Sequence, residues 1–489
     1  MSPLALVLLT SLVGRTDLEF SSDHLRGWEG DGFALVASGS GRLATSQDGA
    51  EKPRKAILHR TFVLPASAAY ITFRAALIRP EGTPNSEALL DIVLEGGGRS
   101  FAPREVREGE KWIAAPALLP PENRKLREYR WQVEKFAGKR VRIALVDQDD
   151  RPGCYLLSSG FQVTTRDEIH AQAFARDMAR LQQEHGLPRI SRHDSKHFIA
   201  LSNTSTADTE YRLENCETLY DSFFDHFRKR GFAVRPPAEK LMVAIFNSQK
   251  GFEAYLGQNP GDAITGVYHT PTNRLVVYDF ATNNAFVRGK KRFEEVARSG
   301  STDLERQQRS VTLGRYVRDR RDDTNLSTIM HEVAHQLSFN GGLLTRGGDA
   351  PAWLTEGLAM YCESTRRGVW QGIGEPNPQR AETLAQQIRN RGELLSLRAL
   401  VSNDDWLRKA HRVDQVVLGY AQSWALFRLL MEERPTQLRA YIESLRARKT
   451  AEHRLADFVA GFGTDLTRLD KRYQEYLREI ARKEVASRP

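Results

Sequence analysis

Cysteine is scarce in this chain of 489 residues, and the few cysteines lie far apart. They are Cys154, Cys216 and Cys362, and no two of them form a CxxC pair. Disulfide-rich scaffolds and cysteine zinc knuckles need paired or closely spaced cysteines, so the sequence excludes both. At most one disulfide is available to such a set, and we expect buried free thiols instead.

Long hydrophobic runs are also missing. Nothing in the chain approaches the roughly 18 uninterrupted apolar residues of a membrane-spanning helix. The run from Pro3 to Gly14 is about as long as the apolar core of a signal peptide, although no basic residue precedes it and no small-x-small cleavage site follows. We expect residues 1–20 to be a signal peptide and the protein to be exported to the periplasm, the cell surface or the medium. The alternative is a buried N-terminal strand.

Acidic residues are outnumbered by basic ones, which gives a net charge of +9. The excess is concentrated between Arg288 and Arg321, where basic residues mix with Glu and Asp and aromatic residues are few. Nucleic-acid binders usually add a recognisable module or interleaved stacking residues, and this segment has neither. We therefore predict a solvated, partly flexible loop and no nucleic-acid partner.

The length predicts two or three domains, and residues 24–165 have the texture of an all-β sandwich. Short apolar or alternating runs are separated there by Gly, Pro, Asn and Asp clusters. The expected strands are 57–64, 69–77, 88–94, 129–133, 140–146 and 155–163. At Thr165 the period becomes helical, and Thr165 with Glu168 makes a capping box, so we place a domain boundary near 165.

Residues 129–163, YRWQVEKFAGKRVRIALVDQDDRPGCYLLSSGFQV, are more specific. This segment resembles the closing part of galactose-binding-like jelly rolls, in which a strand, a "FAGK" turn and two further strands follow one another. Such modules often bind carbohydrate, so the resemblance implies a jelly roll and a candidate carbohydrate partner. A purely structural sandwich is the alternative.

Residues 166–489 mix strands with helices and then contain helices only, which predicts an α+β domain. A strand at 196–202, a helix with the apolar stripe Cys216, Tyr220, Phe223 and Phe227, and a strand at 240–246 come first. A hairpin of 264–269 and 274–280 follows. The mixed sheet and an active-site helix should extend to about 345, with a helical part over 346–489.

The segment HEVAHQ, residues 331–336, puts two histidines and a glutamate in one frame. On a helix His331 and His335 are one turn plus about 40° apart, so both imidazoles can converge on a metal. Glu332 is offset from that face, so it would lie near the metal without binding it. A general base needs this position to take a proton from water at the metal. An N-cap in residues 324–328 is expected to start this helix. An ordinary helix-surface pair is the alternative.

Zinc hydrolysis needs a third protein ligand and an open fourth position. Residues 350–363, APAWLTEGLAMYCE, predict a second helix with Pro351 in its first turn. Glu356 on that helix is the candidate ligand, and Gly357 beside it allows close helix approach. The Gly-rich connection 341–348 lets this helix fold back over the first, so one zinc ion per chain is expected.

HEVAHQ followed by WLTEGLA resembles the gluzincin metallopeptidases, especially the thermolysin-like and aminopeptidase branches. The resemblance implies a zincin-like domain with His331, His335 and Glu356 as zinc ligands and Glu332 as the base. From HFIALS at 197 through GVYHTPTNRLVVYD to YAQSWAL at 420, the chain is similar to a bacterial branch of that superfamily. No signature of the aminopeptidases' N-terminus-binding loop precedes the motif, which favours an endopeptidase.

Two further parts of such a site can be assigned. In related enzymes a tyrosine or histidine donates to the oxyanion, and Tyr420, at the head of the helix YAQSWALFRLL, is the candidate. A tyrosine packed between helices is the alternative. The strand from Thr265 to His269 can form a sheet edge that pairs with an extended peptide at Gly266 and Val267, Gly266 allowing close approach. An ordinary hairpin explains this strand as well. The helices at 426–431, 438–445 and 466–480 are expected to wall the cleft.

These observations predict an exported zinc peptidase that acts on a peptide or protein, with Glu332 as general base. Two other functions stay open. One is a binding or scaffold protein that keeps the zinc fold without turnover and holds glycan or another surface ligand. The other is a zinc hydrolase of a bond other than a peptide. An intact Glu332 argues against a silent enzyme but does not distinguish the two hydrolases.

Overall fold

The computed structural model describes residues 18–20, 25, 27–38, 41–47, 55–83, 90–96, 100–109, 111–122, 125–299, 302–409 and 413–486. The chain divides into two compact units, residues 1–173 and 174–489. Residues 1–17 of the expected signal peptide lie outside the described residues, whereas Leu18 and Phe20 are buried in the core of the first unit. Within the described part, no helix has both the length and the apolar character that a membrane crossing requires.

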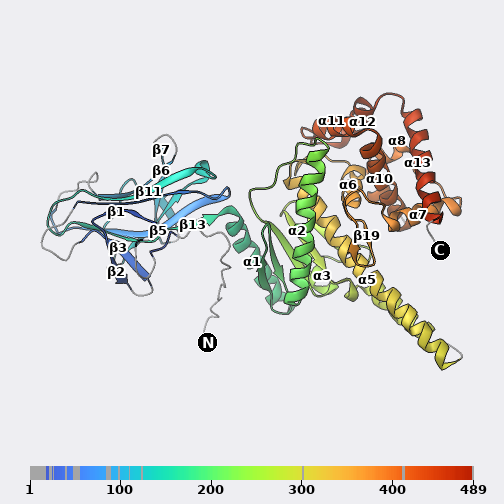
Figure 1. The fold of residues 1–489 in the computed structure, drawn as a ribbon, viewed down its shortest axis with the longest axis horizontal. Coiled ribbons are helices and arrows are strands. Elements are labelled where there is room, and N and C mark those ends of the chain that lie inside the picture. Colours follow the sequence, from blue (N-terminus) through green and yellow to red (C-terminus); the bar gives the residue numbers. More distant parts are fainter. Residues whose placement is uncertain are drawn as a thin grey trace. The chain divides into compact units, whose positions relative to one another are not determined.

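The first unit is an antiparallel β-sandwich (Figure 1). One sheet has the order β1 (Glu29–Asp31), β4 (Ala56–Val63), β11 (Arg140–Asp147), β6 (Leu90–Gly96) and β7 (Ser100–Phe101). The other runs β2 (Ala34–Ser38), β3 (Gly41–Thr45), β12 (Tyr155–Ser159), β5 (Ala68–Ile78), β10 (Arg127–Gln132), β8 (Arg104–Glu108) and β9 (Lys111–Ala114), with β13 (Gln162–Thr165) also paired to β5. The predicted all-β sandwich is confirmed.

Alternation of apolar and polar residues builds the sandwich core. In β6, Leu90, Ile92 and Leu94 are buried and the residues between them are only partly covered. The expected single strand 155–163 is wrong: it is two strands, β12 and β13, that both pair with β5. The break falls at Gly160, where a Cβ would lie 2.6 Å from the Glu19 Cα, and at Phe161, which turns into the aromatic core. Strands β1, β2, β3, β7, β8 and β9 are short or polar and were not predicted.

The second unit is built on a five-stranded mixed sheet. Its order is β14 (Ser191–Asp194), β15 (Phe198–Ser202), β16 (Leu241–Phe246), β18 (Arg274–Tyr278) and β17 (Gly266–His269). The inner strands β15, β16 and β18 are parallel, and each outer strand is antiparallel to its neighbour. Every residue of β15 and β16 is buried, because both faces of the sheet centre are covered. Strand β17 is an edge strand that pairs with β18 alone among the described strands.

Helix α1 (Arg166–His185) includes the point at which the chain divides into the two units. Helices also form the rest of the second unit. Two of them, α2 (Thr206–Lys229) and α5 (Asp303–Asn340), share a core with the sheet. The others are α3 (Gln249–Leu256), α4 (Asn284–Arg298), α6 (Ala352–Cys362), α7 (Pro378–Arg389), α8 (Leu397–Ser402), α9 (Asp405–Arg408), α10 (Val413–Glu433), α11 (Pro435–Leu445), α12 (Arg454–Phe462) and α13 (Leu466–Ala486). A small ribbon of β19 (Thr365–Arg366) and β20 (Val369–Trp370) follows α6. The α+β class with a helical C-terminal part matches the expectation.

The expectation of a loop at 288–321 is wrong, because these residues form α4 and the first half of α5. The two helices project from the rest of the unit in Figure 1. Phe293 of α4 meets Tyr316 of α5 edge to face, with ring centroids 5.6 Å apart. The sequence did not predict this pair because its residues are mostly charged, and helices that pack mainly on one another need only a narrow stripe of apolar side chains.

The expected N-cap within 324–328 is also wrong. Helix α5 begins at Asp303, where the side chain of Thr302 accepts a hydrogen bond from the Glu305 N–H. Residues 324–328 lie inside the same continuous helix as the histidine motif. The motif therefore lies in the last third of one helix that is 38 residues long.

Candidate metal centre

The histidine motif is fixed by the buried face of α5. Ile329, Met330 and Val333 pack in the core of the second unit, which leaves the opposite side of the helix to carry His331 and His335. Gln336 extends this anchoring, because its amide donates to the carbonyls of Met242 and Asn273 at 3.1 Å each. The starts of the parallel strands β16 and β18 thus fix where α5 lies along its axis and how it is rotated about that axis, and this places His331 and His335.

The Glu356 helix is fixed by two other contacts. A Cβ on Gly357 would lie 2.6 Å from the Ser423 carbonyl oxygen, so glycine lets α6 approach α10 closely, as expected for a helix contact. Before α6, the buried Arg454 guanidinium pairs with Asp349 at 2.6 Å and with Asp404 at 2.7 Å. Asp404 in turn accepts from the Ala352 N–H at 2.9 Å, which holds the first turn of α6 in place.

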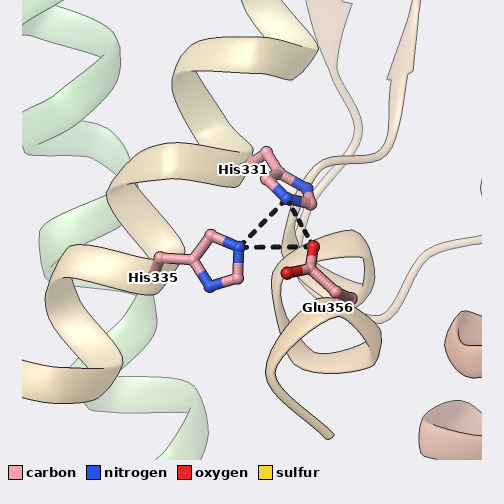
Figure 2. Close-up of side chains that lie close together, drawn as sticks. All are labelled: His331, His335 and Glu356. Carbon is pink, nitrogen blue, oxygen red and sulfur yellow. Dashed lines mark hydrogen bonds and ion pairs between the residues drawn. The ribbon is translucent and has the colours of Figure 1, made fainter. Parts of the chain in front are cut away.

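His331, His335 and Glu356 point toward one another from α5 and α6 (Figure 2). The two Nε2 atoms are 3.1 Å apart, and the Glu356 Oε2 lies 3.2 Å from the His331 Nε2 and 3.5 Å from the His335 Nε2. Ligands about 2.1 Å from a tetrahedral zinc ion are about 3.4 Å from each other, so these separations fit one zinc ion. The structure brings the three predicted ligands together, and two nitrogens with one carboxylate are a donor set that zinc prefers.

Glu363 was not predicted, and it is the residue that orients His331. Its Oε2 lies 2.6 Å from the His331 Nδ1, which leaves Nε2 to face the other two ligands. Its Oε1 accepts from Asn377 and from the Arg380 Nε, both at 2.9 Å. A carboxylate behind a histidine ligand fixes the tautomer and the ring orientation. The signal was available, because Glu363 follows Glu356 by seven residues and so shares its helical face.

Burial and charge pairing set the ionisation of this cluster. Burial opposes the charged form of His331, yet its hydrogen bonds to Glu356 and Glu363 raise its pKa to about 10. Burial raises the pKa of the carboxylates Glu356 and Glu363, but their positively charged neighbours lower it by more. Arg380 and His331 lower the pKa of Glu363 to about 2, and the two histidines hold the pKa of Glu356 well below its ordinary value. Both carboxylates are therefore ionised, so that Glu356 can ligate a cation and Glu363 can accept a hydrogen bond from His331.

Glu332 is buried beside this triad, on the same helix. Burial raises its pKa above the ordinary value, and the positive charge of His331 and His335 acts against that rise. A raised carboxyl pKa brings a group closer to the pH at which general bases work best. Glu332 is not one of the three converging residues, which agrees with its expected role beside the metal rather than on it.

Gly266 lies directly against Glu332. A Cβ at residue 266 would lie 3.0 Å from the Glu332 Cγ and 2.6 Å from the Thr328 Cγ2. Glycine is therefore needed here for the close approach to α5, and the approach of a bound peptide to Gly266 stays a prediction. The hydroxyls of Thr265 and Thr328 are 2.7 Å apart and tie the start of β17 to the helix. Val267 follows on the edge strand and lines the same cleft.

Tyr420 lies in the middle of α10, not at its head as expected, because the helix begins at Val413. It lines the cleft together with the triad. Its ring meets the Trp406 ring edge to face, with the centroids 5.6 Å apart. Tyr420 therefore also packs against a neighbouring helix, as the alternative interpretation expected. Burial raises the pKa of its hydroxyl, and the negative charges of Glu356, Glu332 and Glu363 add to the rise. The hydroxyl is therefore protonated at neutral pH and can donate.

These residues share one cleft of about 1170 Å³. Its walls are β17 and the segment before it, α4, α5, the start of α6, α7, α9 and α10. The expectation that residues 426–431, 438–445 and 466–480 wall the cleft is wrong, because none of them lines it; α10 contributes only earlier residues, Val413, Val416, Val417 and Tyr420. Helix α7 takes their place, with Gln379, Arg380 and Thr383 among its lining side chains.

Comparisons with known proteins give one family match. A family model described as a protein of unknown function, DUF1570, matches residues 325–452, which include the triad, Glu332, Glu363 and Tyr420. The comparison with curated proteins found no match. The match covers well under half of the chain.

Several solved structures show a distant likeness. The carbohydrate-binding module TmCBM61, solved with β-1,4-galactotriose, is 12% identical, has a TM-score of 0.21 and aligns over 31% of this chain and 97% of its own. A functionally unknown conserved protein from Bacillus anthracis str. Ames is 10% identical, with a TM-score of 0.26, over 86% of this chain and 72% of its own. IMPa from Pseudomonas aeruginosa, in complex with an O-glycopeptide, is 8% identical, with a TM-score of 0.18, over 88% of this chain and 51% of its own. The N-terminal sandwich is the part that resembles the carbohydrate-binding modules. TM-scores this low define neither the fold nor the activity of this chain.

The contact between Glu363 and His331 can be tested by Glu363→Gln, which keeps the size of the side chain. Loss of the charged acceptor should lower the zinc affinity about 10- to 100-fold, because the imidazole loses its fixed orientation. The measurement is competition with a chromogenic chelator. Glu382→Gln, on the α7 wall of the same cleft, is the matched control and should bind zinc as the wild type does. Equal affinities for all three proteins would contradict this role for Glu363.

Proposed function

We propose that this protein is a zinc-dependent peptidase of the gluzincin type that cleaves within peptide chains. One observation carries the proposal: three ligand atoms lie 3.1–3.5 Å from one another, and a buried glutamate with a raised pKa stands beside them in an open cleft. A structural zinc site is closed by a fourth protein ligand, whereas a catalytic site keeps one position open. Only three metal-ligating side chains converge here among the described residues.

The roles of the chain's own residues follow from their places. His331, His335 and Glu356 would hold the zinc ion, with Glu363 orienting His331. Bound there, zinc supplies Lewis acidity that polarises a carbonyl and acidifies water. Glu332 takes the proton from the attacking water and passes it to the leaving amine. Tyr420 donates its hydroxyl hydrogen to the oxygen that becomes negative as the carbonyl is attacked.

The edge strand supplies a place for an extended substrate. Strand β17 has no partner on its outer side among the described strands, and its residues Gly266, Val267 and Tyr268 line the cleft next to Glu332. A peptide can add to such an edge through main-chain hydrogen bonds, which leaves its side chains to the surrounding walls. The cleft extends on both sides of the triad, from α4 to α10, which favours an endopeptidase.

The two other functions are less well supported. A binding or scaffold protein would have no need for a buried, raised-pKa carboxylate beside the triad, since burying an extra charge costs free energy. A zinc hydrolase of a non-peptide bond would use the same triad and base. The open edge of β17 favours the peptide, because strand addition reads a peptide backbone. Export remains part of the proposal, resting on the apolar segment at residues 3–14.

For the sandwich we propose carbohydrate binding on the outer face of the larger sheet. There the Arg130 guanidinium lies between the Tyr70 and Trp112 rings, 4.5 and 4.4 Å from their centroids. Glu105 accepts from the Arg130 Nε at 2.6 Å and from the Gln132 amide at 3.2 Å. A flat face that combines partly exposed rings with fixed polar groups suits a sugar, which has apolar C–H faces and a rim of hydroxyls.

The peptidase proposal predicts a separation between metal binding and turnover. Wild-type protein should bind about one zinc ion per chain by elemental analysis, and His331→Ala should lose it. Glu332→Gln should keep the zinc yet lower kcat/KM on a mixed peptide library by at least about a thousandfold, since it removes the base. A zinc-loaded wild type that cleaves no peptide in the library would refute the proposal and favour the scaffold.

Tyr420→Phe tests the oxyanion role. It should lower kcat about 10- to 1000-fold while the zinc content and KM stay near those of the wild type, because the hydrogen bond strengthens only in the transition state. Steady-state kinetics with a fluorogenic peptide measure the split between kcat and KM. If Tyr420 only packs between helices, the variant should instead keep its kcat.

Trp112→Ala tests the sandwich surface. It should weaken binding to a responsive polysaccharide by about tenfold or more, because this partly exposed ring supplies most of the apolar contact. Affinity electrophoresis against a panel of soluble polysaccharides measures this. Val63→Ala, on the other sheet and exposed, is the control and should bind normally. No retention by any polysaccharide would exclude carbohydrate as the ligand.

A further inference from the structure

The helix pair formed by α4 and the part of α5 up to residue 321, here called the arm, continues the cleft away from the triad. We propose, resting on the peptidase function above, that the arm selects acidic substrates: Arg320 pairs with a carboxylate about five residues from the scissile bond. The occupant is an extended acidic segment of the substrate polypeptide.

The cleft itself leads onto the arm. Phe286, Lys290 and Phe293 of α4 and Tyr316 and Arg320 of α5 line the same 1170 Å³ cleft as His331 and Glu356. The arm is therefore not a separate surface but one end of the space that holds the triad. A polypeptide long enough to reach beyond the triad on that side must run along it.

The helical repeat of α5 puts Arg320 on the same side of the helix as His331. Arg320 precedes His331 by 11 residues in one unbroken helix. Eleven residues make three turns plus about 20°, so the two side chains leave the helix on nearly the same side. Thr324, seven residues before His331, lies within about 20° of it as well and also lines the cleft.

The rise of the helix sets the register. Eleven residues at about 1.5 Å each span about 16 Å along the axis. An extended peptide covers about 3.3 Å per residue, so about five residues bridge that span. A substrate side chain five positions from the bond cleaved at the triad is thus the one that meets Arg320.

Charge complementarity identifies the occupant as acidic. Residues 284–321 contain eleven Lys and Arg against five Asp and Glu, a net charge of +6 out of +9 for the whole chain. Arg320 is exposed, and none of the ion pairs in the described part of the chain includes it. Lys290 across the cleft is 55% exposed and lies 4.0 Å from Glu294, at the limit of an ion pair. A substrate carboxylate at Arg320 would therefore displace no ion-pair partner, and Lys290 has only a weak one.

Apolar contacts lie next to these cations. Tyr316 is 55% exposed and Phe293 is 37% exposed, and both line the cleft one turn of helix beyond Arg320 and Lys290 respectively. Such rings suit an apolar residue placed beyond the acidic one in the substrate. Asp262, an acidic group that also lines this cleft, is already paired with the arm residue Arg288 at 2.6 Å and not with Arg320 or Lys290.

The experiment uses full-length zinc-loaded protein and two peptides that share one cleavage site taken from the library screen. They differ only in carrying Glu or Gln at the fifth position on one side, and a mirror pair carries the change on the other side. Wild type should cleave the Glu peptide of one pair about three- to tenfold better in kcat/KM than its Gln partner, as an exposed ion pair allows. The preference should shrink at 0.5 M salt, where the Debye length falls to about 4 Å.

Arg320→Glu should reverse that ratio and favour a peptide with Lys at the fifth position. Arg315→Glu is the matched control: it makes the same charge change on the same helix, five residues away and about 140° around it, and it does not line the cleft. It should keep the wild-type ratio. A wild type that cleaves all peptides equally, or a ratio that Arg320→Glu leaves unchanged, overturns the role of the arm while the peptidase function stands. If no peptide is cleaved, the peptidase function fails, and this inference falls with it.

Discussion

The site is governed by the need to neutralise three carboxylates that are buried in one small space. Glu332, Glu356 and Glu363 lie around His331, and burial opposes the ionised form of each. Two of them are nevertheless ionised, because His331 and Arg380 supply positive charge within hydrogen-bonding distance. A divalent cation held by His331, His335 and Glu356 would take over the positive charge that the proton on His331 supplies, because a histidine that ligates a metal is neutral.

Much of the second unit holds α5 and α6 in fixed positions, and this keeps the charged side chains of the site close together. The sheet fixes α5 through Gln336, while the Asp349–Arg454–Asp404 network fixes the start of α6 from the opposite side. Two helices that are held by different parts of the fold can present ligands from positions 25 residues apart within a few tenths of an ångström of tetrahedral spacing. Preorganisation of this kind is what a metal site requires, because ligands that must be gathered on binding lose affinity.

The sequence predicted what depends on local periodicity. His331 and His335 follow from the helix repeat, and the sandwich strands follow from alternation. Glu363 was not predicted, although it shares a helical face with Glu356, because the sequence does not show that its partner is His331, 32 residues earlier. The arm was mistaken for a loop, because its helices are highly charged and each buries only a narrow stripe against the other. Tyr420 was placed correctly in the cleft but at the wrong point of its helix, since Val416 and Val417 before it gave a weak helical signal.

Because α5 is one uninterrupted helix, the arm and the histidines cannot turn independently. Insertion or loss of two residues between them would swing the outer half of the helix by about 200°, and its cleft-facing side chains would then face solvent. Changes of seven or eleven residues would nearly restore the original facing and alter only the reach. Related chains with a longer or shorter arm should therefore differ in whole multiples of the helical repeat.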